Sequence, residues 1–405
     1  MELGQLSEQV RMDALPHGWQ DYTIGQTLTL INGLAFRPGE WKAHGIPIIR
    51  IQNLNDDNSP YNYYDGPISE KYRIRAGDIL FAWSGTTGTS FGARIWTGPN
   101  AVLNQHIFKV TPDKTKVTPY YSFLVLQNVQ KEIERQAHGF KSSFVHVKKS
   151  DLVKVSLPIP PIPEQRAIGE ALSEIDQLIA NLGRLVEKKR VIKHGMMQEL
   201  LTGKTRLPGF TEPWSAGIFE QLAVPSRERA MPRDVPPTTP LVELEQVESG
   251  SGRLVGKSQA ADAISLKAVF RPGDVLFGKL RAYLRKFWFA DVAGLCTTEI
   301  WVLRARPGVD SRFVRSIVET ERFIEAASGA YGTHMPRSDW GTVRSLSVDI
   351  PPHDEQRAIA SVLADIDREI SILHARLAKA RDVKQGMMQQ LLTGRTRLPV
   401  QESAA

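Results

Sequence analysis

The chain has 405 residues, 41% of them hydrophobic, and its 51 basic and 44 acidic residues leave a net charge of +7. This length predicts more than one domain, and a single cysteine excludes a disulfide framework and suits a reducing compartment. The first ten residues lack a basic, apolar signal and no apolar run reaches about 18 residues, so we expect a cytoplasmic protein that does not enter a membrane. The small basic excess is spread over the whole chain, which is a mild indication of a nucleic-acid partner.

The first segment, residues 1–157, is expected to fold as an α+β domain rich in short strands. Its strand signals include PIIRIQNL at 47–54 and RIRAGDILFAW at 73–83, where a Gly-Asp turn precedes three apolar residues. A helix is expected over Tyr120 to Gln136.

A long helix is predicted within residues 158–208. A proline pair at 160–161 and the acidic Glu164 are start signals, whereas Gly203 followed by Pro208 is a stop signal. Between them, apolar residues alternate at spacings of four and three, which is typical of a helix that packs on one other helix. These residues are Ile168, Leu172, Ile175, Ile179, Leu182 and Val186. Gly195 interrupts the pattern, and we expect a kink or a close helix crossing there.

Residues 209–349 resemble the first domain faintly. VFRPGDVLFGK at 269–279 corresponds to the earlier Gly-Asp segment, and PLVELEQV at 240–247 corresponds to PIIRIQNL. A second strand-rich α+β domain is therefore predicted, with a helix over Ser311 to Ala327.

The last segment, residues 350–405, repeats the long helix. Aligned without gaps, about 28 of about 50 positions are identical at a period of about 191 residues, with Gly386 in the place of Gly195. Each helix would have about 40 residues and a length of about 60 Å, and its narrow apolar stripe cannot be buried alone. We expect the two helices to pack antiparallel as a coiled-coil spacer, which gives the molecule pseudo-two-fold symmetry. The alternative is that each helix packs on its own domain.

Residues that follow the Gly-Asp strands are candidates for contact with double-stranded DNA. Amide side chains can pair with adenine and arginine with guanine, at about 1–3 kcal/mol of discrimination each. In the second domain the candidates are Lys279, Arg281, Tyr283, Arg285 and Lys286, although a strand with outward cations and inward aromatics would show the same pattern. In the first domain the candidates after the Gly-Asp strand are Trp83 and Ser84, in a neutral, flexible loop, and then Asn104, Gln105 and His106. Arg37 and Lys42, which precede that strand, are further candidates. Lys141, Ser142 and Ser143 align loosely with Tyr331, Thr333 and His334, and such side chains suit phosphates as well as bases.

Enzyme signatures are weak. SGSGRLVGKS at 249–258 has serine at position 251, where a phosphate-binding loop requires glycine, and no Asn/Asp-Pro-Pro-aromatic tetrapeptide of adenine methyltransferases is present. The histidines show no metal-ligand spacing with Cys296. We therefore expect the chain to catalyse no reaction and to hold neither a metal nor a cofactor.

The repeated segments, PPxxEQRAI at the start and GMMQxLLTGxTRLP at the end, each following a domain with a Gly-Asp strand, resemble the specificity subunit of type I restriction-modification systems. The resemblance covers essentially the full length. It implies two target-recognition domains that each read one half of a split DNA target and that are held apart by two helices. It also implies that these helices dock two copies of a modification subunit, which methylates adenine with its own S-adenosylmethionine, and that two restriction subunits can join.

The halves agree closely in the helices and poorly in the domains, as expected if the helices meet the same partner twice. A coiled-coil seam alone would not explain the matched polar positions, which favours docking. The docking candidates are Gln165, Arg166, Met196, Met197, Gln198, Thr202 and Arg206, with Gln356, Arg357, Met387, Met388, Gln389, Thr393 and Arg397. Two other functions stay open: a self-sufficient DNA-binding regulator, and the recognition chain of an enzyme that fuses nuclease and methyltransferase.

Overall fold

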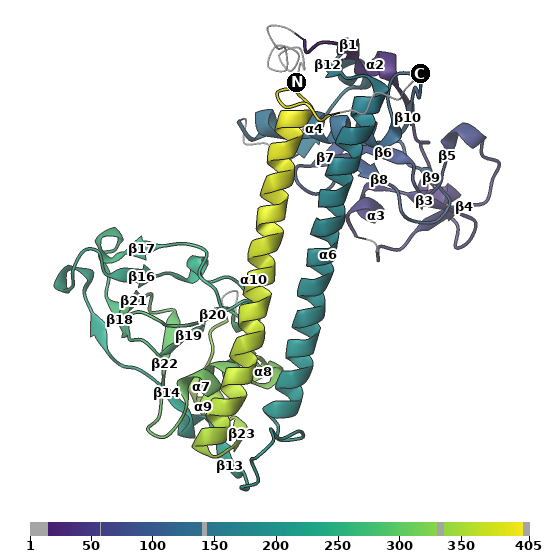
Figure 1. The fold of residues 1–405 in the computed structure, drawn as a ribbon. Helices are drawn as coiled ribbons and strands as arrows, with labels where there is room; N and C mark the ends of the chain where they lie inside the picture. Colours follow the sequence, from purple (N-terminus) through teal and green to yellow (C-terminus); the bar gives the residue numbers. More distant parts are fainter. Residues whose placement is uncertain (1–14, 57, 140–143, 330–335, 400–405) are drawn as a thin grey trace. The chain divides into compact units, whose positions relative to one another are not determined.

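The computed structural model describes residues 15–56, 58–139, 144–329 and 336–399 (Figure 1). Two compact units divide the chain: unit 1 comprises Met1–Asn181 and Leu377–Ala405, and unit 2 comprises Leu182–Arg376. Both long helices therefore contribute one part to each unit. Lys141, Ser142, Ser143, Tyr331, Thr333 and His334 lie outside the described residues.

Unit 1 contains two four-stranded sheets, ordered β2-β10-β6-β8 and β4-β3-β9-β5, and the strand pairs β1-β12 and β7-β11. The strands are β1 (Gln20–Thr23), β2 (Leu28–Asn32), β3 (Ile46–Ile49), β4 (Asn62–Tyr64), β5 (Arg73–Ile74), β6 (Ile79–Ala82), β7 (Ser84–Thr86), β8 (Gly92–Ile95), β9 (Ala101–Leu103), β10 (Ile107–Pro112), β11 (Phe144–His146) and β12 (Ser156–Ile159). The α-helices are α2 (Ile24–Thr27), α3 (Ile51–Asn55), α4 (Pro119–Gly139), α5 (Lys149–Leu152), the first part of α6 (Ile162–Leu200) and the last part of α10 (His353–Leu391).

Unit 2 has the sheets β14-β22-β19-β20 and β15-β18-β21-β16-β17, and the strand pair β13-β23. Its strands are β13 (Ser215–Ile218), β14 (Ala223–Pro225), β15 (Arg229–Ala230), β16 (Pro240–Val242), β17 (Ser258–Gln259), β18 (Lys267–Phe270), β19 (Val275–Gly278), β20 (Phe287–Phe289), β21 (Gly294–Cys296), β22 (Ile300–Ala305) and β23 (Ser347–Ile350). Its further α-helices are α7 (Ser311–Val318), α8 (Glu321–Ser328) and α9 (Trp340–Arg344).

The Gly-Asp segments form the same turn in both units. Gly77 and Gly273 take φ values of +94° and +90°, a left-handed conformation that glycine adopts without strain. The side chains of Asp78 and Asp274 then accept hydrogen bonds from the backbone N–H groups of residues 75 and 271, both at 2.9 Å. Each turn leads into a fully buried central strand, β6 or β19, as predicted.

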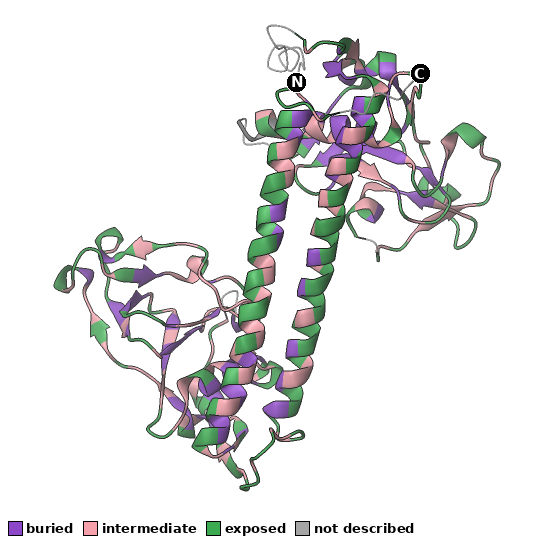
Figure 2. Ribbon diagram, viewed as in Figure 1, coloured by how far each residue is buried: buried purple, intermediate pink, exposed green. Residues whose placement is uncertain are grey.

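The core of unit 1 lies between the sheet of β6 and β10 and the helices that cover it (Figure 2). Phe81 of β6 and Phe108 of β10 belong to the same buried cluster as Tyr121 of α4. Leu172 of α6 and Met388 of α10 complete this cluster, so parts of both long helices pack on the domain as well as on each other. Within this unit, parts of both long helices therefore pack on the domain, whereas the coiled-coil spacer stays a prediction.

The core of unit 2 is built in the same way. Phe277 of β19 and Phe313 of α7 are fully buried and cluster with Leu200 of α6 and Leu363 of α10. The sheet orders of the two units correspond strand for strand around β6 and β19, and each unit also contains one parallel strand pair, β3-β9 or β16-β21. The faint sequence likeness of the domains thus reflects a common strand plan.

The long helices have 39 residues each, close to the predicted length of about 40. A glycine in the left-handed conformation follows the C-terminal end of each, Gly203 after α6 and Gly394 after α10. Both helices continue through Gly195 and Gly386, and a Cβ atom added at either glycine would meet no atom within 4 Å. The expected close helix crossing at these glycines is therefore wrong. The helix predicted over Tyr120 to Gln136 is confirmed as α4.

The helix predicted over Ser311 to Ala327 is divided into α7 and α8. Thr320 lies between them in an extended conformation, and its hydroxyl accepts a hydrogen bond from the backbone N–H of Phe323. Threonine is a common N-cap, so this residue starts a new helix where the apolar period alone predicts a continuous one.

Candidate nucleic-acid interface

Three segments of unit 1 converge at the end of β6. The backbone N–H of Trp83 donates to the carbonyl of His106 at 3.2 Å, and the carbonyl of Trp83 accepts from the N–H of Val147 at 2.9 Å. The Trp83 indole N–H donates to the carbonyl of Gln105 at 3.1 Å. Its ring centroid lies 5.3 Å from that of His106 and 4.8 Å from that of His146. The structure therefore brings together the predicted Trp83, Gln105 and His106, and adds His146.

The exposed polar atoms of this cluster are amide and imidazole groups. The Gln105 side chain is exposed, and its Nε2 atom lies 3.3 Å from Nε2 of His106. The Nδ1 atom of His106 is buried without a hydrogen-bond partner among the described residues. Phe144, at the start of β11, is 59% exposed, which is unusual for a large aromatic side chain in a strand. The sequence could not single out His146 as a neighbour of Trp83, because the pairing of β11 with the distant strand β7 brings it there.

Ser84 does not belong to the exposed part of this cluster. The segment after Trp83 was expected to be a flexible loop, but residues 84–86 form β7, which pairs with β11. The Ser84 side chain is consequently buried, so its predicted DNA contact is not available on the surface. Asn104 is half-buried, and its backbone N–H is bonded to the carbonyl of Ile49 at 2.9 Å.

Unit 2 repeats the convergence with charged residues. The N–H of Lys279 donates to the carbonyl of Glu299 at 3.0 Å, and the carbonyl of Lys279 accepts from Ser338 at 2.8 Å. The guanidinium of Arg337 donates to both carboxylate oxygens of Glu299, at 2.9 and 3.3 Å, which raises the pKa of Arg337 and lowers that of Glu299. The two units share this backbone frame, which is the pair of backbone hydrogen bonds made by Trp83 in unit 1 and by Lys279 in unit 2. Arg337 takes the position of His146, and Glu299 takes that of His106.

The turn between β19 and β20 carries two arginines with left-handed backbones. Arg281 has φ 54° and Arg285 has φ 51°, and they flank the short 3-10 helix Ala282–Leu284. The N–H of Arg281 donates to the carbonyl of Pro336 at 2.9 Å, and the carbonyl of Arg285 accepts from Gly250 at 2.9 Å. Two other segments of the unit thus hold a turn that bulky residues rarely adopt.

The predicted basic residues of this turn differ in their contacts. Arg285 pairs with Glu321, and the Lys286 ammonium donates to the carbonyl of Leu244 at 2.8 Å, so both have internal partners. Arg281 and Tyr283 are exposed, and the described residues offer their side chains no hydrogen bond or ion pair. Of these four residues, Arg281 and Tyr283 therefore project from the turn without such a partner among the described residues.

Arg37 and Lys42 are exposed as predicted, but they lie apart from these clusters in their contacts. Arg37 starts a 3-10 turn, and Lys42 pairs through its backbone with Tyr63 at 2.9 Å. Within the described residues, no hydrogen bond, ion pair or ring contact joins either side chain to Trp83 or its neighbours.

The matched glutamines at the helix starts have internal roles. Gln165 accepts from the N–H of Thr118 at 2.8 Å and donates to the carbonyl of Pro160 at 2.9 Å. Gln356 makes the corresponding bonds with Asp310, at 3.0 Å, and with Pro351, at 2.9 Å. Both side chains are buried and offer no surface to a partner, so the prediction that they dock a partner is wrong.

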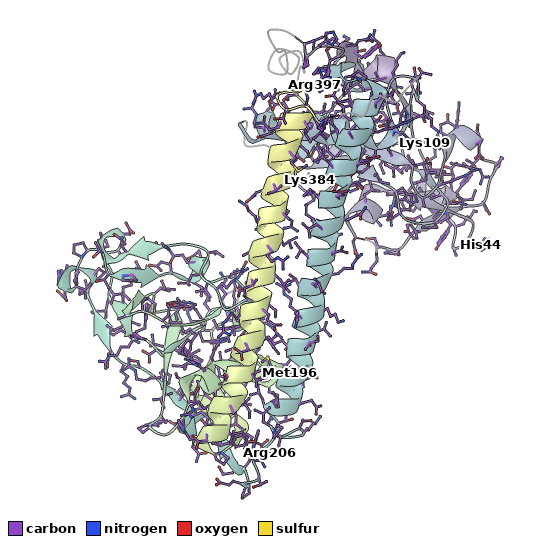
Figure 3. The ribbon with its side chains drawn as sticks, viewed as in Figure 1. His44, Lys109, Met196, Arg206, Lys384 and Arg397 are labelled. Atoms are coloured by element: carbon purple, nitrogen blue, oxygen red, sulfur yellow. The ribbon has the colours of Figure 1, made fainter. Side chains whose placement is uncertain are left out.

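The matched arginines, Arg206 and Arg397, lie beyond the ends of the long helices (Figure 3). Both have internal partners. Arg206 donates twice to the carboxylate of Glu355, which is 0% exposed, and the Trp214 indole donates to it at 2.8 Å. In unit 1, Arg397 donates twice to the buried Glu164, and the Trp19 indole donates to it at 3.0 Å. We call each of these Arg-Glu-Trp groups a clamp. Within each unit, the clamp joins the end of one long helix to the start of the other.

Several other matched residues are explained by helix packing. The hydroxyls of Thr202 and Thr393 donate to the carbonyls of Gln198 and Gln389, both at 2.6 Å, at the last turns of their helices. Met197 and Met388 are buried, and Met196 and Met387 pack at the edges of the two cores. Arg166, Arg357, Gln198 and Gln389 are exposed, so their docking stays a prediction.

In the part of the chain that the structure describes, no group of three or more His, Cys, Asp or Glu side chains is placed to hold a metal ion. Cys296 is buried in β21, which raises the pKa of its thiol to about 12. No helix among the described residues is long and apolar enough to cross a bilayer.

Comparisons with known proteins agree with this architecture. Residues 16–188 match the family described as the type I restriction modification DNA specificity domain. The putative type I restriction enzyme MjaX specificity subunit of Methanocaldococcus jannaschii is 24% identical over 96% of both chains. The EcoDI specificity subunit of Escherichia coli is 22% identical over 94% of this chain and 89% of that protein.

A solved structure shares the fold. The crystal structure of the type I restriction-modification S subunit from M. genitalium superposes with a TM-score of 0.56 at 14% identity, over 94% of this chain and 97% of that one. The family match over residues 16–188, the nearly full-length likeness to curated specificity subunits and the shared fold together support a specificity subunit of a type I restriction-modification system.

Proposed function

We propose that this chain recognises a split DNA target through two domains and docks two adenine-methyltransferase subunits on its long helices, without catalysing a step itself. The observation that carries the proposal is the pair of strand-end clusters. They share one backbone frame but differ in chemistry: Trp83, Gln105 and His106 in unit 1, and Lys279, Arg281 and Tyr283 in unit 2. Different side chains on the same frame suit two half-sites of different sequence.

The helices support the partner role in a different way. Their clamps have the same residues in both units, and five of the six predicted seam positions are identical in the two helices. Any protein that binds the exposed residues beside them therefore meets nearly the same surface twice. Arg166 and Arg357 are such exposed residues at equivalent positions. In this proposal the two helices form an antiparallel coiled coil, the methyltransferases supply S-adenosylmethionine, and restriction subunits join the assembled complex.

The net charge fits a protein that reads bases while its partners supply much of the phosphate contact. An excess of seven positive charges over 405 residues is small for a protein that would bind DNA tightly alone. This also separates the proposal from a self-sufficient regulator, which would bind its operator without a methyltransferase.

The test is to express this chain with its cognate methyltransferase subunit in a host that lacks adenine methylation, and to map modified adenines by single-molecule sequencing. We expect one motif of two short half-sites with a fixed, unspecified gap, present only when this chain is present. Methylation that is unchanged when this chain is omitted would overturn the proposal and favour a regulator. A control without the methyltransferase shows the background of the host.

A further inference from the structure

The turn between β9 and β10 of unit 1 presents Gln105 on a fixed backbone. The N–H of Asn104 donates to the carbonyl of Ile49 at 2.9 Å, and the carbonyl of Asn104 accepts from the N–H of Ile107 at 3.1 Å. The carbonyl of Gln105 accepts from the Trp83 indole at 3.1 Å. Gln105 is exposed, whereas the residues on either side of it are half-buried. We call this exposed middle residue the tip of the turn.

The chain beyond β2 holds the turn from a second side. Gly33 packs so closely that a Cβ atom added to it would clash with the carbonyl oxygens of Leu103 and Asn104. The N–H of Leu34 donates to the carbonyl of Leu103 at 2.8 Å. Because all of these contacts lie within unit 1, the backbone of the turn is ordered before a ligand binds, and binding carries little further cost of ordering.

Unit 2 has the same turn, between β21 and β22, with a different residue at its tip. The N–H of Thr297 donates to the carbonyl of Val242 at 3.1 Å, and the carbonyl of Thr297 accepts from the N–H of Ile300 at 3.0 Å. Thr298 is the exposed middle residue, again between half-buried neighbours. The two units therefore hold a glutamine and a threonine at the same place on the same backbone, so the tip residue can differ without a change in the fold.

The side chain of Gln105 is oriented by its neighbour His106. The amide nitrogen of Gln105 lies 3.3 Å from Nε2 of His106, and because an amide nitrogen can only donate, the imidazole nitrogen accepts. The other imidazole nitrogen, Nδ1, is buried, so His106 has no second polar atom to offer to a ligand. Gln105 keeps one N–H and its amide oxygen, and neither has a partner among the described residues.

The free part of this amide is a hydrogen-bond donor beside an acceptor. In the major groove, adenine presents an acceptor, N7, beside a donor, the N6 amino group, whereas guanine presents two acceptors. A glutamine amide is therefore complementary to adenine, and a guanidinium is complementary to guanine. Trp83 and His106, the neighbours that hold Gln105, bring neither a guanidinium nor a carboxylate to the turn.

We infer that Gln105 reads an adenine in the half-site of unit 1 and that His106 is the positioning residue for its amide. The amide donates to N7 and accepts from the N6 amino group of this adenine. The adenine that is read stays stacked in the duplex, whereas a methyltransferase takes its target base out of the stack, so the two adenines are different bases. The inference rests on the proposed function and deepens it, because it assigns one base to one residue.

The test measures how the assembled complex of this chain and its methyltransferase subunits discriminates among the four base pairs at each position of the mapped target. Fluorescence anisotropy compares duplexes that differ at one position. Gln105→Thr places the tip residue of unit 2 on the turn of unit 1, which the shared backbone should accept. We expect the preference for adenine at one position of one half-site to fall by roughly 5- to 150-fold, while the other half-site keeps its preferences.

Two further variants and a control separate reading from a general loss of binding. Gln105→Glu replaces the amide donor by a second acceptor, so the preferred base at that position should become cytosine, whose N4 amino group donates. His106→Phe keeps a flat ring beside Trp83 but removes the acceptor, and should lower the preference for adenine at the same position alone. Gln20→Glu is the matched control, because it makes the same change at an exposed glutamine of β1, which pairs with β12, and should leave every preference unchanged.

Thermal unfolding of each variant shows that the fold is retained. Base preferences that are unchanged in Gln105→Thr and Gln105→Glu would overturn the inference and leave the proposed function intact, and so would a change at a position that has no A·T pair. An equal loss of affinity for every duplex would also overturn it, because Gln105 would then contact DNA without reading a base. Absence of any methylated motif with the wild-type chain would overturn the proposed function together with this inference.

Discussion

At the scale of single residues, the turn between β19 and β20 separates structural from available cations. Left-handed backbones cost free energy for residues with a side chain, of the order of 1 kcal/mol, and persist where the surroundings determine them. Here the backbones of Pro336 and Gly250 hold Arg281 and Arg285 in that conformation. Arg285 pairs with Glu321, and this contact lowers the pKa of the Glu321 carboxyl. Arg281, in contrast, stays exposed. The left-handed turn therefore leaves the guanidinium of Arg281 available beside Tyr283.

Replacing Arg281 by alanine is expected to weaken binding of the assembled complex to its target. A lost guanidinium contact to a base costs about 1–3 kcal/mol, or roughly 5- to 150-fold in affinity. Arg312→Ala removes another exposed arginine of unit 2, outside the turn, and should change affinity less than twofold. Fluorescence anisotropy with the mapped target measures both variants. Equal affinities for Arg281→Ala and wild type would show that the turn makes no contact with DNA.

At the scale of the elements, the two long helices are joined in each unit by an ion pair, which is largely buried in unit 2 and partly exposed in unit 1. In unit 2, Lys193 of α6 lies 2.7 Å from Asp367 of α10, and both side chains are less than a quarter exposed. In unit 1, Lys384 of α10 lies 2.7 Å from Asp176 of α6. The same lysine-aspartate pair thus occurs at equivalent positions of the repeat, with the helices running in opposite directions in each unit.

Asp367→Ala is expected to destabilise unit 2 strongly. The substitution leaves Lys193 and Arg315 with one carboxylate, Glu319, in a largely dry site, and the loss of a partner from a buried ion pair costs about 3–5 kcal/mol. Asp365→Ala, two residues away on the same helix, removes an exposed pair with Arg368 and should cost about 0.5 kcal/mol or less. Urea unfolding measures both. A loss below 1 kcal/mol for Asp367→Ala would mean that the pair is hydrated in solution.

The sequence predicts the long elements well because their signals are local. Proline, glycine and the apolar period place α6 and α10 to within a few residues of their ends. Contacts between distant segments are not visible in this way. The pairing of β7 with β11 buries Ser84 and brings His146 to Trp83, and the clamps place Arg206 and Arg397 on buried carboxylates. The polar residues that match between the two helices were predicted to bind a partner protein. Several of them instead stabilise internal packing.

At the scale of the whole molecule, the clamps mark the ends of the two long helices. Each clamp belongs to one unit and joins the segment that follows one helix to the first turn of the other, Arg206 to Glu355 in unit 2 and Arg397 to Glu164 in unit 1. Both helices have 39 residues, so the helical spans between the clamps are equal. In the proposed function this common length sets the gap between the two half-sites, and a change in one helix alone would break the register at a clamp.

Removing one heptad from both helices tests this ruler. Deleting residues 181–187 and the equivalent 372–378 keeps the apolar period in phase, because a heptad returns each seam residue to the same side. The helices shorten by about 10 Å, and since successive base pairs are about 3.4 Å apart, the gap in the methylated motif should shorten by about three base pairs while both half-sites stay the same. Sequencing of modified adenines measures the gap directly, and a deletion of 181–187 alone, which leaves the helices unequal, should abolish methylation. If the doubly shortened chain assembled with the methyltransferase and kept the original gap, the spacing would have to be set by the partner subunits, and the helices would serve only for docking.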